Sequence, residues 1–106
     1  MPVKDVAADG IVPLKFHQVE ALRKHMLLSM GEIAQIFGVS RVTYSGWAKG
    51  KPIRKGNDSN VRAKLVELFT IIETHEWPAP TVLAMRPAQR FTLLTELLLE
   101  LQQKPE

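Results

Sequence analysis

The 106-residue sequence contains no cysteine, so it can form neither a disulfide framework nor a thiolate metal site. No apolar run reaches the roughly 18 residues that a membrane-spanning helix requires. The first residues also lack the long apolar region of a secretory signal. These absences favour a cytoplasmic protein with no membrane contact.

The sequence lacks the residue patterns that several kinds of catalytic site require. The sequence has no glycine-rich phosphate loop and no pair of carboxylates beside a candidate base. His17 and His25 have no third ligand near them in the sequence, so they are better interpreted as structural residues than as metal ligands. We therefore expect no enzyme activity, no cofactor and no bound metal.

Charge is unevenly distributed along the chain. The whole sequence has a net charge of +3, and the first forty residues are neutral. Residues 41–64 carry a net charge of +6, from Arg41, Lys49, Lys51, Arg54, Lys55, Arg62 and Lys64 against Asp58. A basic stretch alone is often a solvated surface, but charge gathered in one segment also suits a polyanion such as DNA.

Residues 29–50 predict two short helices joined by a tight turn. Ser29 is a good N-cap, and Glu32 completes a capping box with it. Gly38 can end the first helix in a left-handed conformation. Ser40 then caps a second helix, which Gly50 ends.

Apolar spacing within this segment indicates a helix-turn-helix. Such a motif places its second helix in the DNA major groove. Tyr44 and Trp47 could instead stack on single-stranded bases, but their spacing of three on the inward face favours the core. The expected inward residues are Ile33, Ala34, Phe37, Val39, Tyr44 and Trp47.

Together with the Lys49–Gly50–Lys51 exit, this segment resembles the phage-repressor-like (Xre, or Cro-type) helix-turn-helix family over roughly residues 15–70. The resemblance implies a transcriptional repressor encoded by a phage, a plasmid or a chromosome. Such a repressor can also regulate its own gene. It also implies that Ser29 and Met30 approach a phosphate at a helix N-terminus. Met30 stands where related repressors often carry a hydrogen-bonding glutamine.

The outward residues of the second helix are the candidates for base contact, namely Arg41, Val42, Thr43, Ser45 and Gly46. Arg41 can bind a guanine bidentately, and Val42 can touch a thymine methyl group. Gly46 has two competing explanations, which are close approach to DNA and close packing with another helix. The candidates for phosphate contact are Ser29, Met30, Lys49, Lys51, Arg54, Lys55, Asn57 and Arg62.

Two further helices are predicted after the basic loop. Asn57 or Asp58 is expected to cap a helix that runs to about Glu76, with an apolar stripe widened by Phe69 and Ile71. A short turn between prolines leads to a leucine-dense helix from about Arg86 to Gln103. We expect this last helix to pair with a second copy through Phe91, Leu94, Leu97, Leu98 and Leu101. Its Leu93 and Leu99 add apolar surface, and the alternative is that the helix folds onto its own domain.

The expected fold is all-α, a compact domain of five to six helices. It comprises a flexible arm (1–13), a helix-turn-helix domain (14–76) and a C-terminal extension (77–106). The expected function is sequence-specific binding of double-stranded DNA by a homodimer that regulates transcription. The alternative is a helix-turn-helix adaptor or antitoxin-type protein, whose main contact is a second protein bound through the C-terminal helix.

Overall fold

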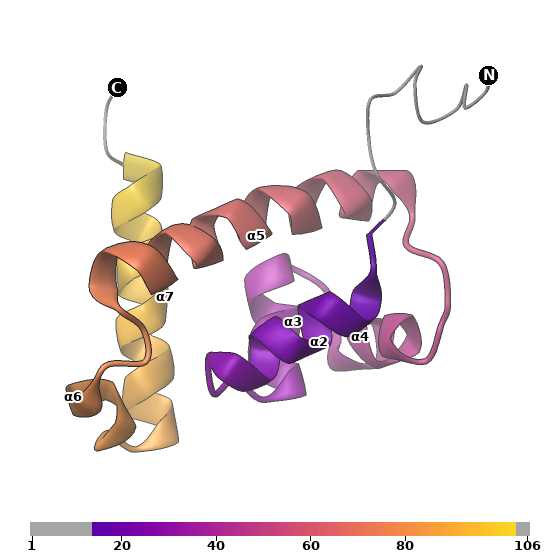
Figure 1. Ribbon diagram of the computed structural model, residues 1–106. Helices are drawn as coiled ribbons and strands as arrows, with labels where there is room; N and C mark the ends of the chain where they lie inside the picture. The colour runs from indigo at the N-terminus through magenta and orange to yellow at the C-terminus, as the bar shows by residue number, and fades with distance from the viewer. Residues whose placement is uncertain (1–13, 104–106) are drawn as a thin grey trace.

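The computed structural model describes residues 14–103, and its regular elements there are all helices (Figure 1). The predicted all-α fold of five to six helices is thereby confirmed, whereas the predicted arm, residues 1–13, lies outside the described residues. The helices are α2 (Phe16–His25), α3 (Met30–Phe37), α4 (Arg41–Ala48), α5 (Lys55–His75), α6 (Pro80–Leu83) and α7 (Pro87–Gln103).

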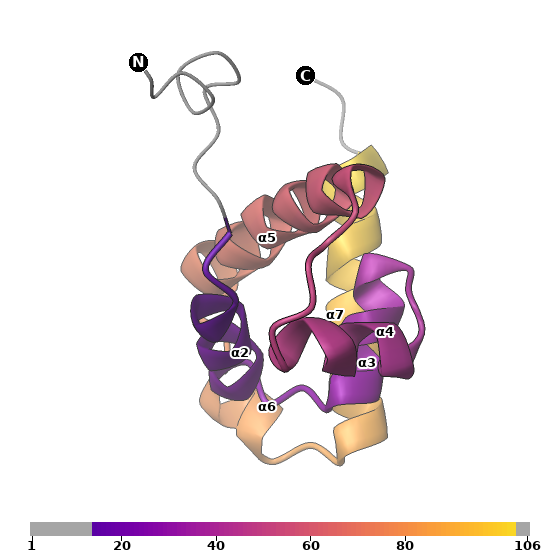
Figure 2. The same cartoon turned by 90° about the vertical axis from the view of Figure 1, so that its right-hand side faces the viewer.

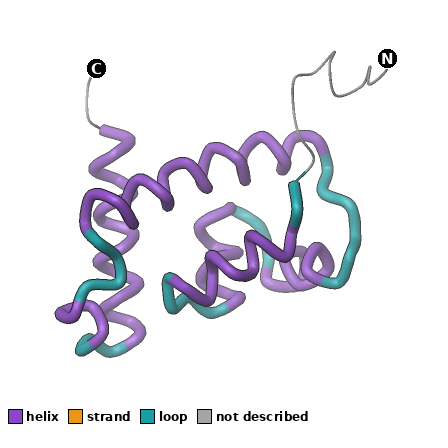
Figure 3. Tube along the Cα trace, in the orientation of Figure 1, coloured by secondary structure: helices purple, strands orange, loops and turns teal. Residues whose placement is uncertain are grey.

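Helices α2, α3 and α4 form a group that the long helix α5 crosses on one side (Figures 1 and 2). Helix α7 stands beside the C-terminal half of α5, with the short α6 near its beginning. The connection between α4 and α5, residues 49–54, forms a wide loop at the outside of the molecule (Figure 3). None of the helices in this range is long and apolar enough to span a bilayer.

The predicted caps of the helix-turn-helix are confirmed. Ser29 Oγ accepts a hydrogen bond from the Glu32 N–H at 3.0 Å, and the Glu32 carboxylate accepts one from the Ser29 N–H at 3.0 Å. Gly38 has a φ of 77°, a left-handed value that costs glycine little. Ser40 Oγ accepts from the Thr43 N–H at 3.0 Å. Ser29 and Glu32 therefore fix where α3 begins, whereas Gly38 and Ser40 fix where α3 ends and α4 begins.

Helix α5 begins earlier than predicted. Its first residue is Lys55, and Arg54 occupies the N-cap position without a side-chain cap. The expectation that Asn57 or Asp58 caps this helix is wrong, because both residues lie inside α5, where the Asp58 carboxylate accepts a hydrogen bond from Arg62 Nε one turn later. The first turn of α5 consequently carries part of the basic segment.

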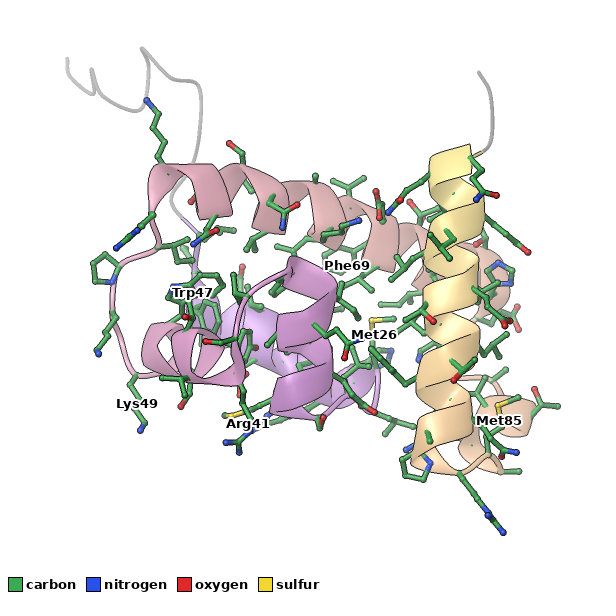
Figure 4. The ribbon with its side chains drawn as sticks, turned by 180° about the vertical axis from the view of Figure 1, so that it is seen from behind. Met26, Arg41, Trp47, Lys49, Phe69 and Met85 are labelled. Carbon is green, nitrogen blue, oxygen red and sulfur yellow. The ribbon has the colours of Figure 1, made fainter. Side chains whose placement is uncertain are left out.

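One apolar core joins the helix-turn-helix to the C-terminal extension. Buried side chains from every helix belong to the same cluster. Trp77, in the link after α5, is almost fully buried, and its Nε1–H donates to the Met26 carbonyl oxygen at 3.1 Å. Figure 4 shows Met26 between the helix-turn-helix and α7. The extension is thus packed as part of the same core.

Two of the predicted dimerisation residues face this core. Leu94 is 0% exposed within the single chain, so the expectation that it contacts a second copy is wrong, whereas Leu98 is 6% exposed and keeps only an edge at the surface. Phe91, Leu97 and Leu101 are partly buried against the same cluster. The seam chosen from the leucine spacing covers the protein's own core, because α5 and the helix-turn-helix supply the opposing apolar surface.

Candidate nucleic-acid interface

The inward face of α4 is held by an aromatic cluster. Tyr44 and Trp47 are buried, as predicted, and the Phe16 ring lies 5.1 Å from the Tyr44 ring and 6.2 Å from the Trp47 ring, centroid to centroid. The rings of Phe37 and Tyr44 are 6.1 Å apart. Tilted and edge-on ring pairs at these separations are favourable. The opposite face of α4 is therefore turned outward.

A polar network also ties α4 to α2, and the sequence did not reveal it. The Tyr44 hydroxyl donates to Glu20 Oε2, and Arg23 Nε and Nη2 each donate to the Glu20 carboxylate at 3.0 Å. Arg23 Nη1 also donates to the Leu28 carbonyl oxygen at 2.8 Å. The i, i+3 spacing of Glu20 and Arg23 was visible in the sequence, but the tyrosine joins them from 24 residues away.

The network shifts the pKa of each of its three side chains, and the hydrogen bonds to Glu20 raise that of Arg23. The hydrogen bonds from Arg23 are the largest cause that lowers the pKa of the Glu20 carboxyl below its ordinary range, with a further contribution from Tyr44. Burial, and then the hydrogen bond to Glu20, raise the pKa of the Tyr44 hydroxyl. Tyr44 therefore stays protonated and remains a donor to an ionised carboxylate, which fixes the rotation of α4 about its axis.

A groove of about 570 Å³ lies between the outward face of α4 and the loop that follows it. It brings together three residues predicted to contact bases and three predicted to contact phosphates. No carboxylate is among the residues that line it in the described chain. The groove is lined by Val39, Ser40, Val42, Thr43, Gly46, Trp47, Lys51, Pro52, Arg54 and Asn57.

Gly46 makes room for Lys51 within this groove. A Cβ placed on Gly46 would lie 3.1 Å from Lys51 Cδ, and the Lys51 N–H donates to the Gly46 carbonyl oxygen at 2.9 Å. In the described chain, the close neighbour of Gly46 is therefore the Lys51 side chain from the loop that follows α4. Of the two explanations for this glycine, close packing with another helix is thus wrong. The contact lays the stem of the lysine along α4.

Arg41 lies apart from the groove, although it is adjacent to Val42. A Cβ on Gly31 would lie 3.8 Å from Arg41 Cδ, so the arginine stem passes close to the beginning of α3. Figure 4 shows Arg41 and Lys49 projecting from the helix-turn-helix on the side away from α5. Ser45 does not line the groove. The predicted base-contact residues are thus divided between the groove and the α3 side of α4.

The remaining predicted phosphate contacts differ in availability. Ser29 uses its hydroxyl in the capping box, and Met30 is partly buried against the core. Arg62 is paired with Asp58 on α5. Lys55 is exposed at the first residue of α5. The cations beside the groove, Lys51 and Arg54, are therefore better placed for a polyanion than Arg62 is.

Comparison with known proteins found no match: no protein family, no curated protein and no solved structure is significantly similar to this chain. Within residues 14–103, no three histidine, aspartate or glutamate side chains gather as a metal site would require.

Proposed function

We propose that this protein binds duplex DNA with α4 in the major groove, and that it regulates transcription. The observation that carries the proposal is the groove beside α4, where outward residues of a rigidly held helix adjoin Lys51 and Arg54 without a carboxylate between them. The cations can contact the phosphate backbone while the outer face of the adjacent helix contacts the base edges.

The division of labour follows from the placement of the side chains. Lys51, Arg54 and Asn57 bind phosphates and set the register of the protein on the duplex. Arg41, on the other side of α4, reaches a guanine edge. Bound at an operator, the protein blocks or recruits polymerase. The resemblance to phage-repressor-like regulators supports this proposal, which includes a cytoplasmic location.

The proposed active form is a homodimer. Its support is apolar surface that α7 leaves uncovered, since Leu99 is 53% exposed and Phe91, Leu97 and Leu101 are only partly buried. A two-fold dimer places two recognition helices on half-sites about one DNA turn apart. Because Leu94 and Leu98 face the core, the contact with the second copy uses the flanks of α7.

The decisive experiment is selection of bound sequences from a random duplex library, with purified protein at near-physiological salt. The proposal expects an enriched inverted repeat and an affinity that falls as salt rises. A single enriched half-site removes the dimer and keeps the DNA reader. DNA binding itself is contradicted if no sequence is enriched and the affinity for duplex DNA does not change with salt concentration.

A second candidate function is an adaptor, favoured by a smaller groove of about 220 Å³ between α3, α5 and α7. Ile36, Phe91, Leu98 and Leu99 supply its apolar lining. An adaptor would bind a partner protein here and would not need the basic groove. If the protein is an adaptor, replacing Leu99 with Ser should abolish binding of the partner protein and the activity that depends on it in the cell. Replacing Lys51 with Ala should leave both intact.

A further inference from the structure

Val42 is unusually exposed for an apolar residue of this protein. Its side chain is 80% exposed, the highest value among the large apolar residues of the described chain. It lies in the first turn of α4, where a β-branched residue brings no advantage in helix propensity. Burial in the core, which explains Tyr44 and Trp47, therefore does not explain this valine.

Of the outward α4 residues that line the groove, namely Val42, Thr43 and Gly46, only Thr43 carries a hydrogen-bonding side chain. Thr43 Oγ1 accepts from Ser40 Oγ at 3.0 Å, which holds this hydroxyl against the N-cap while its own proton can still be donated. Gly46 has no side chain, and the stem of Lys51 covers it. Arg41 is the single charged residue of α4, and its stem runs toward Gly31 on the other side. At the groove, α4 thus offers chiefly methyl groups.

The groove determines what these methyl groups can meet. In the DNA major groove, the apolar group on a base edge is the methyl at C5 of thymine. This carbon lies on the side of the base nearest its own sugar-phosphate strand. Val42 lines the same groove as Lys51 and Arg54, so a strand whose phosphates these two cations bind would bring its pyrimidine C5 positions toward Val42.

We propose that Val42 reads a pyrimidine 5-methyl group, so that the bound site carries thymine, or 5-methylcytosine in its place, at one position of each half-site. This inference rests on the proposed DNA binding and names the chemistry that it recognises. The contact buries the valine methyl groups against the base methyl. Loss of one buried methyl group weakens binding by about fourfold.

The test uses the duplex enriched by the selection, with each thymine replaced in turn by deoxyuridine, which differs only by the absent methyl group. Wild-type protein should lose about fourfold in affinity at one thymine per half-site. The Val42→Ala variant should bind more weakly overall but show no further loss at that thymine. The matched control is Val66→Ala on α5, where an exposed valine far from the groove is shortened in the same way.

A second substitution separates the methyl group from the rest of the base. At the same position, a pair containing 5-methylcytosine should bind wild-type protein about fourfold more tightly than one containing cytosine, and Val42→Ala should bind both alike. Because Val42 is exposed in α4 and alanine is the better helix former, the variant should unfold at or slightly above the wild-type temperature, so weaker binding cannot come from lost folding.

Three results would overturn the proposal while leaving DNA binding intact. They are an enriched site without thymine, equal effects of deoxyuridine at all thymines, and a deoxyuridine effect that persists in Val42→Ala. Failure to enrich any duplex would instead contradict the proposed function on which the inference rests.

Discussion

At the scale of single residues, the separation of Arg41 from the groove gives the two proposed kinds of DNA contact different signatures. Arg41→Ala should cost about 1–3 kcal/mol on the selected site and relax specificity at one base pair. Lys51→Ala should weaken selected and random duplexes alike and lower the salt slope by about one. Titrations of both variants on both duplexes at several salt concentrations measure this. Identical behaviour of the two variants would refute the division into reading and positioning residues.

Glu20 predicts a pH dependence of folding. Because Arg23 holds the pKa of this carboxyl below its ordinary value of 4.5, the folded state binds the proton less readily than the unfolded state. The stability contributed by Glu20 is then complete above about pH 4.5 and is lost as the pH falls through the lower pKa of the folded state. Denaturant unfolding measured from pH 7 downward should show this loss.

The control for this prediction is Glu20→Gln, which cannot ionise. Its stability should be lower than that of the wild type at pH 7, and the difference should shrink as the pH falls. A difference that stays constant down to the acid limit would show that ionised Glu20 does not stabilise the fold.

At the scale of one element, Gly46 lowers the stability of α4 but leaves room for the Lys51 side chain. Gly46→Ala should stabilise α4 by up to about 0.8–1 kcal/mol, since alanine is the better helix former. The new Cβ, 3.1 Å from Lys51 Cδ, should displace the flexible lysine stem. We therefore expect a higher unfolding temperature together with weaker duplex binding. Unchanged binding, in a protein where Lys51→Ala binds more weakly, would show that the stem position is irrelevant.

The end of α5 offers a test of backbone conformation. Glu76 is exposed and has a φ of 51°, a left-handed value that costs a non-glycine residue roughly 1–2 kcal/mol. Glu76→Gly should therefore stabilise the protein by about 1 kcal/mol. The matched control is Glu73→Gly, an exposed position inside α5, which should destabilise by about 1 kcal/mol. Chemical denaturation compares the two, and shifts of the same sign would contradict the argument.

At the scale of the whole molecule, the shared core predicts one unfolding transition. The two tryptophans report on different parts, since Trp47 lies in α4 and Trp77 is the first residue of the extension. Both are buried in the same cluster. In Trp47→Phe and Trp77→Phe variants, the fluorescence transition of the remaining tryptophan should coincide with loss of helix measured by circular dichroism. Separate midpoints within one variant would show that the extension unfolds independently.

Local signals in the sequence were sufficient for most of the helices. The capping box at Ser29 and Glu32, the turn at Gly38 and the cap at Ser40 act within a few residues, so their geometry follows from the residues themselves. The inward direction of Tyr44 and Trp47 follows from a spacing of three, which sets them on one face of any helix.

The contacts between segments far apart in the sequence were decided only by the tertiary structure. Leucine spacing marks α7 as apolar but cannot state which surface covers it, and the structure places Leu94 and Leu98 on the protein's own core. The carboxylate of Glu20 meets the Tyr44 hydroxyl only because α2 and α4 pack together. Lys51 likewise reaches Gly46 only because the loop turns back along α4. The caps and faces of helices are local properties of the chain, whereas the groove beside α4 depends on where packing brings the next segment.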